Sequence, residues 1–300
     1  MNRTVLWLLK KMTFLPQKYF LPFSYEYATG KKLDFDNPVE FNQKIQWYKR
    51  FYRPRILNTL IDKYTVKEYV KDKIGEQYLI KTLGVYTKAS QLDLAELPDK
   101  FVLKAVHTNR HTIIVEDKST LNLSRAKRKL ARWLRSNQYY RTGQEWGYKD
   151  IEPKIIAEEF LTEEGRDSLT DYKFFCFKGE PKYLEVHMNR GGGENYKREI
   201  YDLDFNRLPV NKGTKSNVFE STIQKPQNFE EMINITKILS EGFPFVRVDL
   251  YSIKGKTLFG ELTFYPGDGR SEYYPDKYNT IFGDMIQLPQ LNGKTAITKI

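Results

Sequence analysis

Two hairpin patterns in the C-terminal half of the chain constrain the fold most. Residues 171–188, DYKFFCFKGEPKYLEVHM, and residues 244–269, PFVRVDLYSIKGKTLFGELTFYPGDG, are rich in aromatic and β-branched residues, which favour strands. Each contains a short polar tract, KGEP in the first and residues 253–256 in the second, at the place where a hairpin turn belongs. The sequence therefore predicts long antiparallel strands in this half of the chain.

Helical patterns precede and interrupt these strands. Residues 38–79 carry apolar residues at mixed three- and four-residue spacing and predict two or three helices, and residues 229–243 predict another. Residues 123–140 predict a strongly basic helix with one apolar face. Between them, FVLKAV (101–106) and TIIVED (112–117) predict a second hairpin. The order favours an α+β fold whose sheets face each other across a cleft.

The charge and the single cysteine limit the classes of function. A net charge of +11 indicates an anionic partner, such as a phospholipid surface, nucleotide phosphates or an acidic polymer. No helix-turn-helix, zinc-finger or RNP1-type signature is visible, so we expect no nucleic-acid partner. Cys176 lies in an apolar strand pattern and is expected to be buried, and a single cysteine forms no disulfide framework. The chain is expected to be cytoplasmic.

The N-terminal segment, residues 1–36, is a basic amphipathic candidate. The apolar run Val5–Leu9 is broken by Lys10 and Lys11 and is too short to span a bilayer, which needs about 20 apolar residues. Two interpretations stay open. The first 15 residues contact the inner face of a membrane peripherally, with Trp7 and Phe14 in the interface, or they form a helix packed on the protein's own core.

The final hairpin carries polar side chains suited to metal and phosphate chemistry. Arg247 and Asp249 lie two residues apart on one strand, as do Glu261 and Thr263 on the next, so each pair shares a face. If the strands pair, two carboxylates and an arginine converge, and such carboxylates suit a Mg²⁺ ion that also holds phosphate oxygens. The alternative is an ordinary solvated sheet face with an Arg–Asp pair.

Lysines also occur inside apolar strand patterns. Lys104 ends FVLK and Lys173 lies in DYKFF, and a lysine there is unfavourable unless its ammonium reaches water or an anion. Phosphate binding and extension of the side chain to solvent both satisfy this requirement. Glu158 and Glu159 form an acidic end to the apolar strand pattern IIAEEF.

Taken in order, these motifs resemble the ATP-grasp superfamily. A strand lysine, an EE-hydrophobic-Leu strand end, D-x-K, R-x-D and E-x-T follow one another. More closely, the chain resembles the TupA-like branch, which is associated with teichuronopeptide and capsular polysaccharide biosynthesis. The similar stretches span residues 38–269 and include PVEFNQKIQWYK, FVLKAVH, IIAEEFL, DYKFFCFKGEPKY, FPFVRVDLY and GELTFYPGDG. The resemblance implies an ATP-grasp fold with a helical part at 37–95, a lid subdomain at 96–160 and a catalytic subdomain at 161–300.

The resemblance also implies a residue role at each matching position. Mg²⁺ ligands would be Asp249 and Glu261, with Thr263 standing where many ATP-grasp enzymes have asparagine. Phosphate or acyl-phosphate contacts would come from Arg247, Arg190 and Lys173. The implied contacts to ATP are Lys63, Lys104, His107, Arg110, Glu158, Glu159, Phe160, Leu161 and Glu164, the last toward the ribose.

One loop departs from the branch. Relatives tend to carry a glycine-containing loop after the FVLK segment, whereas this chain has Thr108–Asn109–Arg110–His111. Glycines let backbone N–H groups approach a phosphate closely, and bulky residues remove that option. Three interpretations stay open: Arg110 and His111 bind phosphate through their side chains, the site accepts a different anionic donor, or turnover has been lost.

The activity that the resemblance implies is an ATP-dependent carboxylate–amine ligase with Mg²⁺. It would act through an acyl phosphate on a uronic acid of a cell-surface glycan or of its lipid-linked precursor. A glycan kinase, a glycosyltransferase and a non-catalytic binding relative remain alternatives on the same scaffold.

Overall fold

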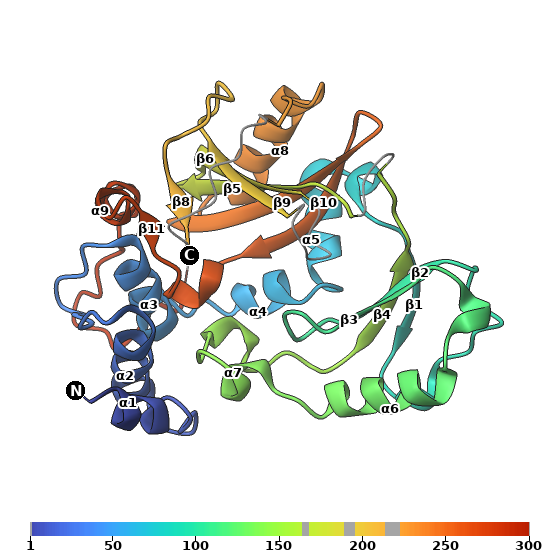
Figure 1. Ribbon diagram of the computed structural model, residues 1–300, viewed down its shortest axis with the longest axis horizontal. Helices are drawn as coiled ribbons and strands as arrows, with labels where there is room; N and C mark the ends of the chain where they lie inside the picture. The colour runs from blue at the N-terminus through green and yellow to red at the C-terminus, as the bar shows by residue number, and fades with distance from the viewer. Residues whose placement is uncertain (1, 164–167, 189–195, 214–222, 300) are drawn as a thin grey trace.

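The computed structural model describes residues 2–163, 168–188, 196–213 and 223–299 (Figure 1). Its helices are α1 (Arg3–Leu9), α2 (Gln17–Thr29), α3 (Phe41–Phe51), α4 (Ile56–Ile61), α5 (Val66–Ile74), α6 (Leu123–Leu134), α7 (Gln138–Arg141), α8 (Phe229–Ser240) and α9 (Lys277–Asp284). Its strands are β1 (Thr82–Tyr86), β2 (Phe101–Ala105), β3 (Thr112–Val115), β4 (Ile155–Glu159), β5 (Asp171–Phe177), β6 (Glu180–Met188), β7 (Lys197–Tyr201), β8 (Asn211–Lys212), β9 (Phe245–Ile253), β10 (Lys256–Thr263) and β11 (Tyr273–Tyr274). The α+β class is confirmed.

A small antiparallel sheet has the strand order β1-β4-β2-β3 within the described residues. The predicted pairing of FVLKAV with TIIVED is its β2–β3 hairpin. Along β2, Phe101 and Leu103 are buried while Val102 and Lys104 are half-exposed, which is the alternation of a sheet with one covered face. The sheet also takes β1, so it crosses the predicted subdomain boundary at residue 96.

Helix α6 covers the apolar face of this small sheet, as Figure 1 shows. Its buried residues Ala126, Leu130 and Trp133 recur at helical spacing, and Leu130 and Trp133 join Leu103 and Phe101 in one apolar cluster. The basic helix predicted over residues 123–140 is interrupted after Leu134. Asn137 begins α7 instead, because its side chain accepts a hydrogen bond from the Tyr139 N–H, a typical helix start.

A large antiparallel sheet has the order β10-β9-β5-β6-β7 within the described part of the chain. Both predicted hairpin turns are present, and each has two consecutive residues at positive φ. These are Lys178 and Gly179 (50° and 80°) between β5 and β6, and Lys254 and Gly255 (49° and 74°) between β9 and β10. Two-residue hairpin turns require this backbone conformation, and glycine adopts it without strain.

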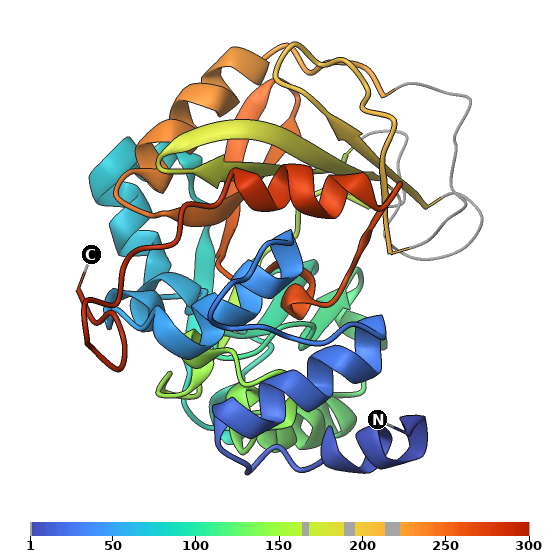
Figure 2. The same cartoon turned by 90° about the vertical axis from the view of Figure 1, so that its left-hand side faces the viewer.

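Helices cover the large sheet unequally. On one face α8 packs through Phe229, which contacts Phe174 at 5.8 Å between ring centroids. On the other face α3 brings Phe41 against Phe175, and α9, which Figure 2 shows lying across the sheet, stacks on Tyr183. The remainder of that second face carries charged side chains and faces the small sheet.

Three helices, α3 to α5, occupy the region for which two or three were predicted. The N-terminal helices α1 and α2 lie at one end of the molecule (Figure 2), and Leu6 is the residue of α1 that is buried. No helix among the described residues is both long and apolar enough to cross a membrane. Cys176 is buried, as expected.

Candidate active site

The polar candidates of β9 and β10 share one face of the large sheet. Asp249 on β9 lies opposite Glu261 on β10, and Arg247 lies opposite Thr263. Residues that are directly opposite in an antiparallel pair project from the same face. The structure therefore brings all four side chains together.

A β-bulge at Gly260 makes this convergence possible. The register between β9 and β10 shifts by one residue between Phe259 and Glu261. If Gly260 were paired regularly instead of bulging out of the ladder, Glu261 would lie opposite Val248 and project from the other face, since a slip of one residue exchanges the faces of a strand. A Cβ atom on Gly260 would lie 3.0 Å from the Asp249 carbonyl oxygen, so glycine suits this close approach. An isolated glycine within a strand pattern is the sequence signal for such a bulge.

Asp249 is buried between two cations. Its Oδ1 accepts a hydrogen bond from Arg247 Nε at 2.6 Å, and its Oδ2 accepts one from Arg247 Nη2 at 2.6 Å and one from Lys173 Nζ at 2.5 Å. Burial by itself would raise the pKa of Asp249, but the positive charges of Arg247 and Lys173 hold the pKa below its usual value. The carboxylate is thus ionised at neutral pH.

The charged row continues across β5 and β6. Lys173 lies opposite Glu185, which pairs with Lys212 Nζ at 2.8 Å and lies 3.2 Å from His187 Nε2. Burial lowers the pKa of His187 to about 4, so its imidazole is neutral at pH 7. The side-chain charges alternate in sign from Asp249 through Lys173 and Glu185 to Lys212. Each buried charge therefore has a neighbour of opposite charge, without which its burial would be very unfavourable.

The opposing wall comes from the small sheet and α5. The Glu158 carboxylate forms ion pairs with Lys104 Nζ at 2.6 Å and with Lys67 Nζ at 2.5 Å. Burial alone would raise the pKa of Glu158, but the two lysines lower it below its usual value. Sequence reasoning missed Lys67, although it lies four residues after Lys63, which is one helical turn.

The loop at residues 108–111, which lacks the glycine expected from the resemblance, still has a backbone conformation that favours glycine. Arg110 has a φ of 67°, in the left-handed region, and its side chain is exposed. Lys63 Nζ donates a hydrogen bond to the Thr108 carbonyl at 2.5 Å and so ties the loop to the start of α5. Burial lowers the pKa of this lysine.

A cleft of about 500 Å³ lies between the two walls. Of the residues predicted from the sequence, it is lined by Lys63, Lys104, Arg110, Glu158, Arg247, Glu261 and Thr263. Asp249 and Lys173 are not among the lining residues and are buried at 1% and 3% exposure, where they hold Arg247 and its neighbours in place. Two sheets distant in sequence thus present basic and acidic side chains to one volume.

Other predicted residues lie outside this cleft. His107 is buried, with Nε2 2.9 Å from the Trp133 carbonyl oxygen. Glu159 is exposed at the end of β4, and Phe160 and Leu161 follow it half-exposed. Glu164 and Arg190 lie outside the described residues.

A second charged cluster lines the far end of the cleft and was not predicted. Asp268 pairs with Lys49 of α3 and with Arg270, and Glu145 lies beside them. Burial, and then the negative charge of Asp268, raise the pKa of Glu145 to about 8. Lys49 is fully buried, and the sequence offered one signal for it, a lysine on the apolar face of QWYKRF.

The donor set on β9 and β10 fits a Mg²⁺ ion held together with phosphates. Among the described residues, no three His, Cys, Asp or Glu side chains gather as a metal cage. Mg²⁺ commonly binds one or two carboxylates and completes its shell with phosphate oxygens and water. Glu261 lines the cleft, and its Oε2 has no hydrogen-bond partner among the described residues, so it is open to an ion. Asp249 Oδ1 accepts a single hydrogen bond and so keeps a lone pair, but it lies beneath the cleft surface behind Arg247. Thr263 adds a hydroxyl oxygen beside them.

No curated protein matches this chain. Among solved structures, the chain is similar to D-alanine–D-alanine ligase from Bacillus anthracis complexed with ATP, at 14% identity and a TM-score of 0.41, covering 70% of this chain and 55% of that one. It is similar to the Helicobacter pylori D-alanine–D-alanine ligase at 16% identity and a TM-score of 0.43, covering 84% and 68%.

It is also similar to the ATP-grasp ligase PsnB complexed with a phosphomimetic variant of its minimal precursor, Mg and ADP, at 11% identity and a TM-score of 0.43, covering 78% and 60%. The chain thus spans little more than half the length of some of these proteins. The family model described as TupA-like ATPgrasp matches residues 43–287, which include both walls of the cleft. The chain belongs to the TupA-like ATP-grasp family.

Proposed function

We propose that this protein is an ATP-dependent carboxylate–amine ligase that acts through an acyl phosphate. The observation that carries the proposal is the cleft itself, in which Lys63 and Lys104 face Arg247 and Glu261 from the opposite sheet. Family membership supports the same class of reaction. Basic groups on one wall and carboxylates on the other suit a nucleotide whose phosphates carry a magnesium ion.

Glu158 and its two lysines form the proposed nucleotide end of the cleft. Lys67 and Lys104 each reach the Glu158 carboxylate within 2.6 Å. A bound phosphate would compete for these ammonium groups, and the freed carboxylate would accept a hydrogen bond from the adenine amine. The backbone of Phe160 and Leu161, at the end of β4, would hold the ring edge, with Glu159 beside it. Glu164 remains a prediction for the ribose.

Asp249, Glu261 and Thr263 are the proposed magnesium ligands. When bound, Mg²⁺ would neutralise phosphate charge during phosphoryl transfer. Lys173 and Arg247 hold the Asp249 carboxylate in one orientation through hydrogen bonds of 2.5 and 2.6 Å. This preorganisation avoids moving charged groups during the reaction.

The reaction would proceed in two steps at the centre of the cleft. A substrate carboxylate oxygen attacks the γ-phosphorus of ATP, ADP leaves, and an acyl phosphate forms. A neutral amine then attacks the carbonyl carbon, inorganic phosphate leaves, and the amine loses a proton. Arg247, which lines the cleft and is 11% exposed, would bind the transferred phosphoryl group, together with Arg190.

The proposed acceptor is a uronic acid of a cell-surface glycan or of its lipid-linked precursor. The net charge of +11 would favour such an anionic acceptor. Residues 2–15 would bring the protein to the membrane that carries the precursor. In this segment Trp7, Leu8 and Phe14 are exposed, and Lys11 lies 3.4 Å from the Trp7 ring centre.

Two measurements test the ligase proposal. Titration calorimetry with ATP and Mg²⁺ should show binding to the wild type and to Lys100→Ala, an exposed control, and at least about tenfold weaker binding to Lys104→Ala. Phosphate release should then require both a uronic acid and an amine. Consumption of a nucleotide sugar would instead indicate a glycosyltransferase, phosphorylation of a glycan hydroxyl a kinase, and nucleotide binding without turnover a non-catalytic relative.

The membrane contact has its own test. The variant Trp7→Ser/Phe14→Ser keeps the buried Leu6 and should bind anionic liposomes more weakly without changing soluble turnover. Equal liposome binding by this variant, or by a chain that lacks the first 15 residues, would contradict the membrane proposal.

A further inference from the structure

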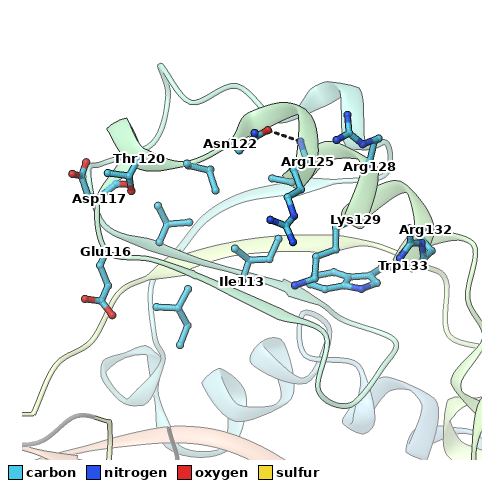
Figure 3. A pocket seen from close by; sticks show the side chains of 14 residues that line it. Ile113, Glu116, Asp117, Thr120, Asn122, Arg125, Arg128, Lys129, Arg132 and Trp133 are labelled. Carbon is cyan, nitrogen blue, oxygen red and sulfur yellow. Dashed lines mark hydrogen bonds between the residues drawn. The ribbon is translucent and has the colours of Figure 1, made fainter.

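A groove of about 990 Å³ runs between α6 and the edge strand β3 (Figure 3). Its floor includes Ile113 of β3 and Ala126 and Trp133 of α6. Strand β3 lies at the end of the strand order β1-β4-β2-β3, so it borders the groove directly. The groove therefore lies on the helix-covered side of the small sheet and is separate from the candidate active site.

Four cations line this groove, and two carboxylates, Glu116 and Asp117, line it from the turn after β3. Arg125, Arg128, Lys129 and Arg132 are exposed and belong to α6, whose sequence LSRAKRKLARWL contains no acidic residue. Figure 3 shows Arg125 and Lys129 extending over Ile113. None of the four forms an ion pair with another described residue. Like charges three and four residues apart on a helix repel each other, so a bound polyanion would relieve an existing repulsion.

The groove is built on a fixed aromatic wall. Trp133 is 5% exposed, and the His111 ring stacks on it at 4.7 Å between centroids and 6° between planes. Lys129 Nζ lies 5.1 Å from the same ring. Because both neighbours cover the indole, it is not free to stack on a nucleobase, which disfavours single-stranded nucleic acid as the occupant.

The groove and the cleft meet at one strand. Thr112 at the start of β3 lines the cleft, and the residues that follow it, Ile113 to Val115, line the groove. Around this strand end, Arg110 lines the cleft and Arg141 Nη1 lies 2.8 Å from His111 Nε2. Basic side chains thus continue from the cleft around the strand end toward the groove.

We infer that this groove binds an acidic glycan chain, namely the part of a polymeric acceptor that extends beyond the reacting uronate. The inference rests on the proposed function. From Arg125 to Arg128 and on to Arg132, the rise along the helix is about 4.5 and 6 Å, a spacing comparable with that of carboxylates along a uronate chain. A polymer held there would present its end to the cleft and leave the chemistry to the residues described above.

The test is calorimetric binding of an oligogalacturonate, without ATP, to three proteins. These are the wild type, Arg125→Gln/Arg128→Gln/Arg132→Gln, and a control with Lys182→Gln/Lys256→Gln/Lys277→Gln. The control removes three exposed lysines far from the groove and so has the same reduced net charge, 11 − 3 = +8. We expect binding to fall about tenfold or more in the groove variant and to stay within about twofold in the control, with salt weakening the wild type.

Equal loss in both variants would show a general charge effect and would overturn the groove assignment. Tighter binding of a single-stranded oligonucleotide or of phosphatidylserine vesicles, lost in the same groove variant, would overturn the glycan as the occupant. The proposed function is read separately by ATP turnover. Groove-dependent oligogalacturonate binding without any ligation would reject the ligase proposal and support the groove assignment. Ligation with an unchanged KM in the groove variant would support the ligase proposal and reject the groove assignment.

Discussion

Neutralising the two proposed magnesium ligands should separate their structural and functional roles. Asp249 is 1% exposed and holds two buried cations, whereas the Glu261 side chain is 42% exposed and reaches Arg247 at 3.3 Å. Removing one partner of a buried ion pair costs about 3 to 5 kcal/mol, and an exposed substitution usually changes stability by less than about 0.5 kcal/mol. Sequence reasoning alone predicts that both variants keep the fold; burial predicts that they differ.

For Asp249→Asn we expect the free energy of unfolding to fall by about 3 kcal/mol, because Arg247 and Lys173 lose their shared counter-charge. In a chain of this size that corresponds to a Tm lower by about 6 to 12 °C. The Tm of Glu261→Gln should equal that of the wild type. Both variants should lose Mg²⁺-dependent turnover.

Thermal unfolding and phosphate release measured on the same preparations decide the matter. A double variant, Lys173→Met/Asp249→Asn, should be less destabilised than the sum of its single variants, because it removes an ion pair rather than orphaning one member. An Asp249→Asn variant with the same Tm as the wild type would refute the argument that Asp249 is a buried ion-pair partner. Full turnover by Glu261→Gln would refute the metal assignment.

Three further predictions concern other parts of the cleft. Lys67→Ala should weaken ATP binding about as much as Lys104→Ala, because both ammonium groups contact Glu158; unchanged titration curves would remove Lys67 from the site. Gly260→Val should reduce activity with the fold retained, because a Cβ at this position would lie 3.0 Å from the Asp249 carbonyl oxygen and disturb the bulge that places Glu261 opposite Asp249; a fully active variant would contradict this account of the bulge. In the folded protein the pKa of Glu145 is raised to about 8, whereas in the unfolded chain it is at its ordinary value of 4.5. The wild-type Tm should therefore fall as pH rises from 5 to 8 relative to Glu145→Gln, and parallel Tm curves would contradict the raised pKa.

Local patterns predicted much of the secondary structure. The turns at Lys178–Gly179 and Lys254–Gly255 follow from residues that accept positive φ between strand-forming runs. The pairing of FVLKAV with TIIVED was predicted from the two strand-forming runs on either side of a polar tract. Such features depend on neighbours within a few residues, so the sequence displays them directly. The break after Leu134 was missed because the polar residues 135–138, RSNQ, contain no glycine or proline to mark it, while a single asparagine cap starts the next helix.

The family resemblance, carried by short motifs, also identified seven of the residues that line the cleft. The resemblance was most informative for side chains whose relative placement is set within one strand. Arg247 and Asp249 are such a pair, because residues two apart on a strand share a face. Matching each motif required only a few consecutive residues. The motifs could not show that Asp249 is buried beneath the cleft rather than open to it.

Contacts between distant segments were decided by the tertiary structure. The Lys67–Glu158 pair joins residues 91 positions apart, 158 − 67, and the pair of Lys49 with Asp268 joins α3 to the loop after β10. Neither pairing leaves a periodic mark in the sequence, because each depends on how two sheets and their helices pack. The bulge at Gly260 is intermediate: the glycine is visible in the sequence, but the direction in which it turns Glu261 depends on the register with β9. The sequence by itself determined the strands, turns and residue types of this site, whereas long-range packing decided which charges meet, since only packing brings distant residues together.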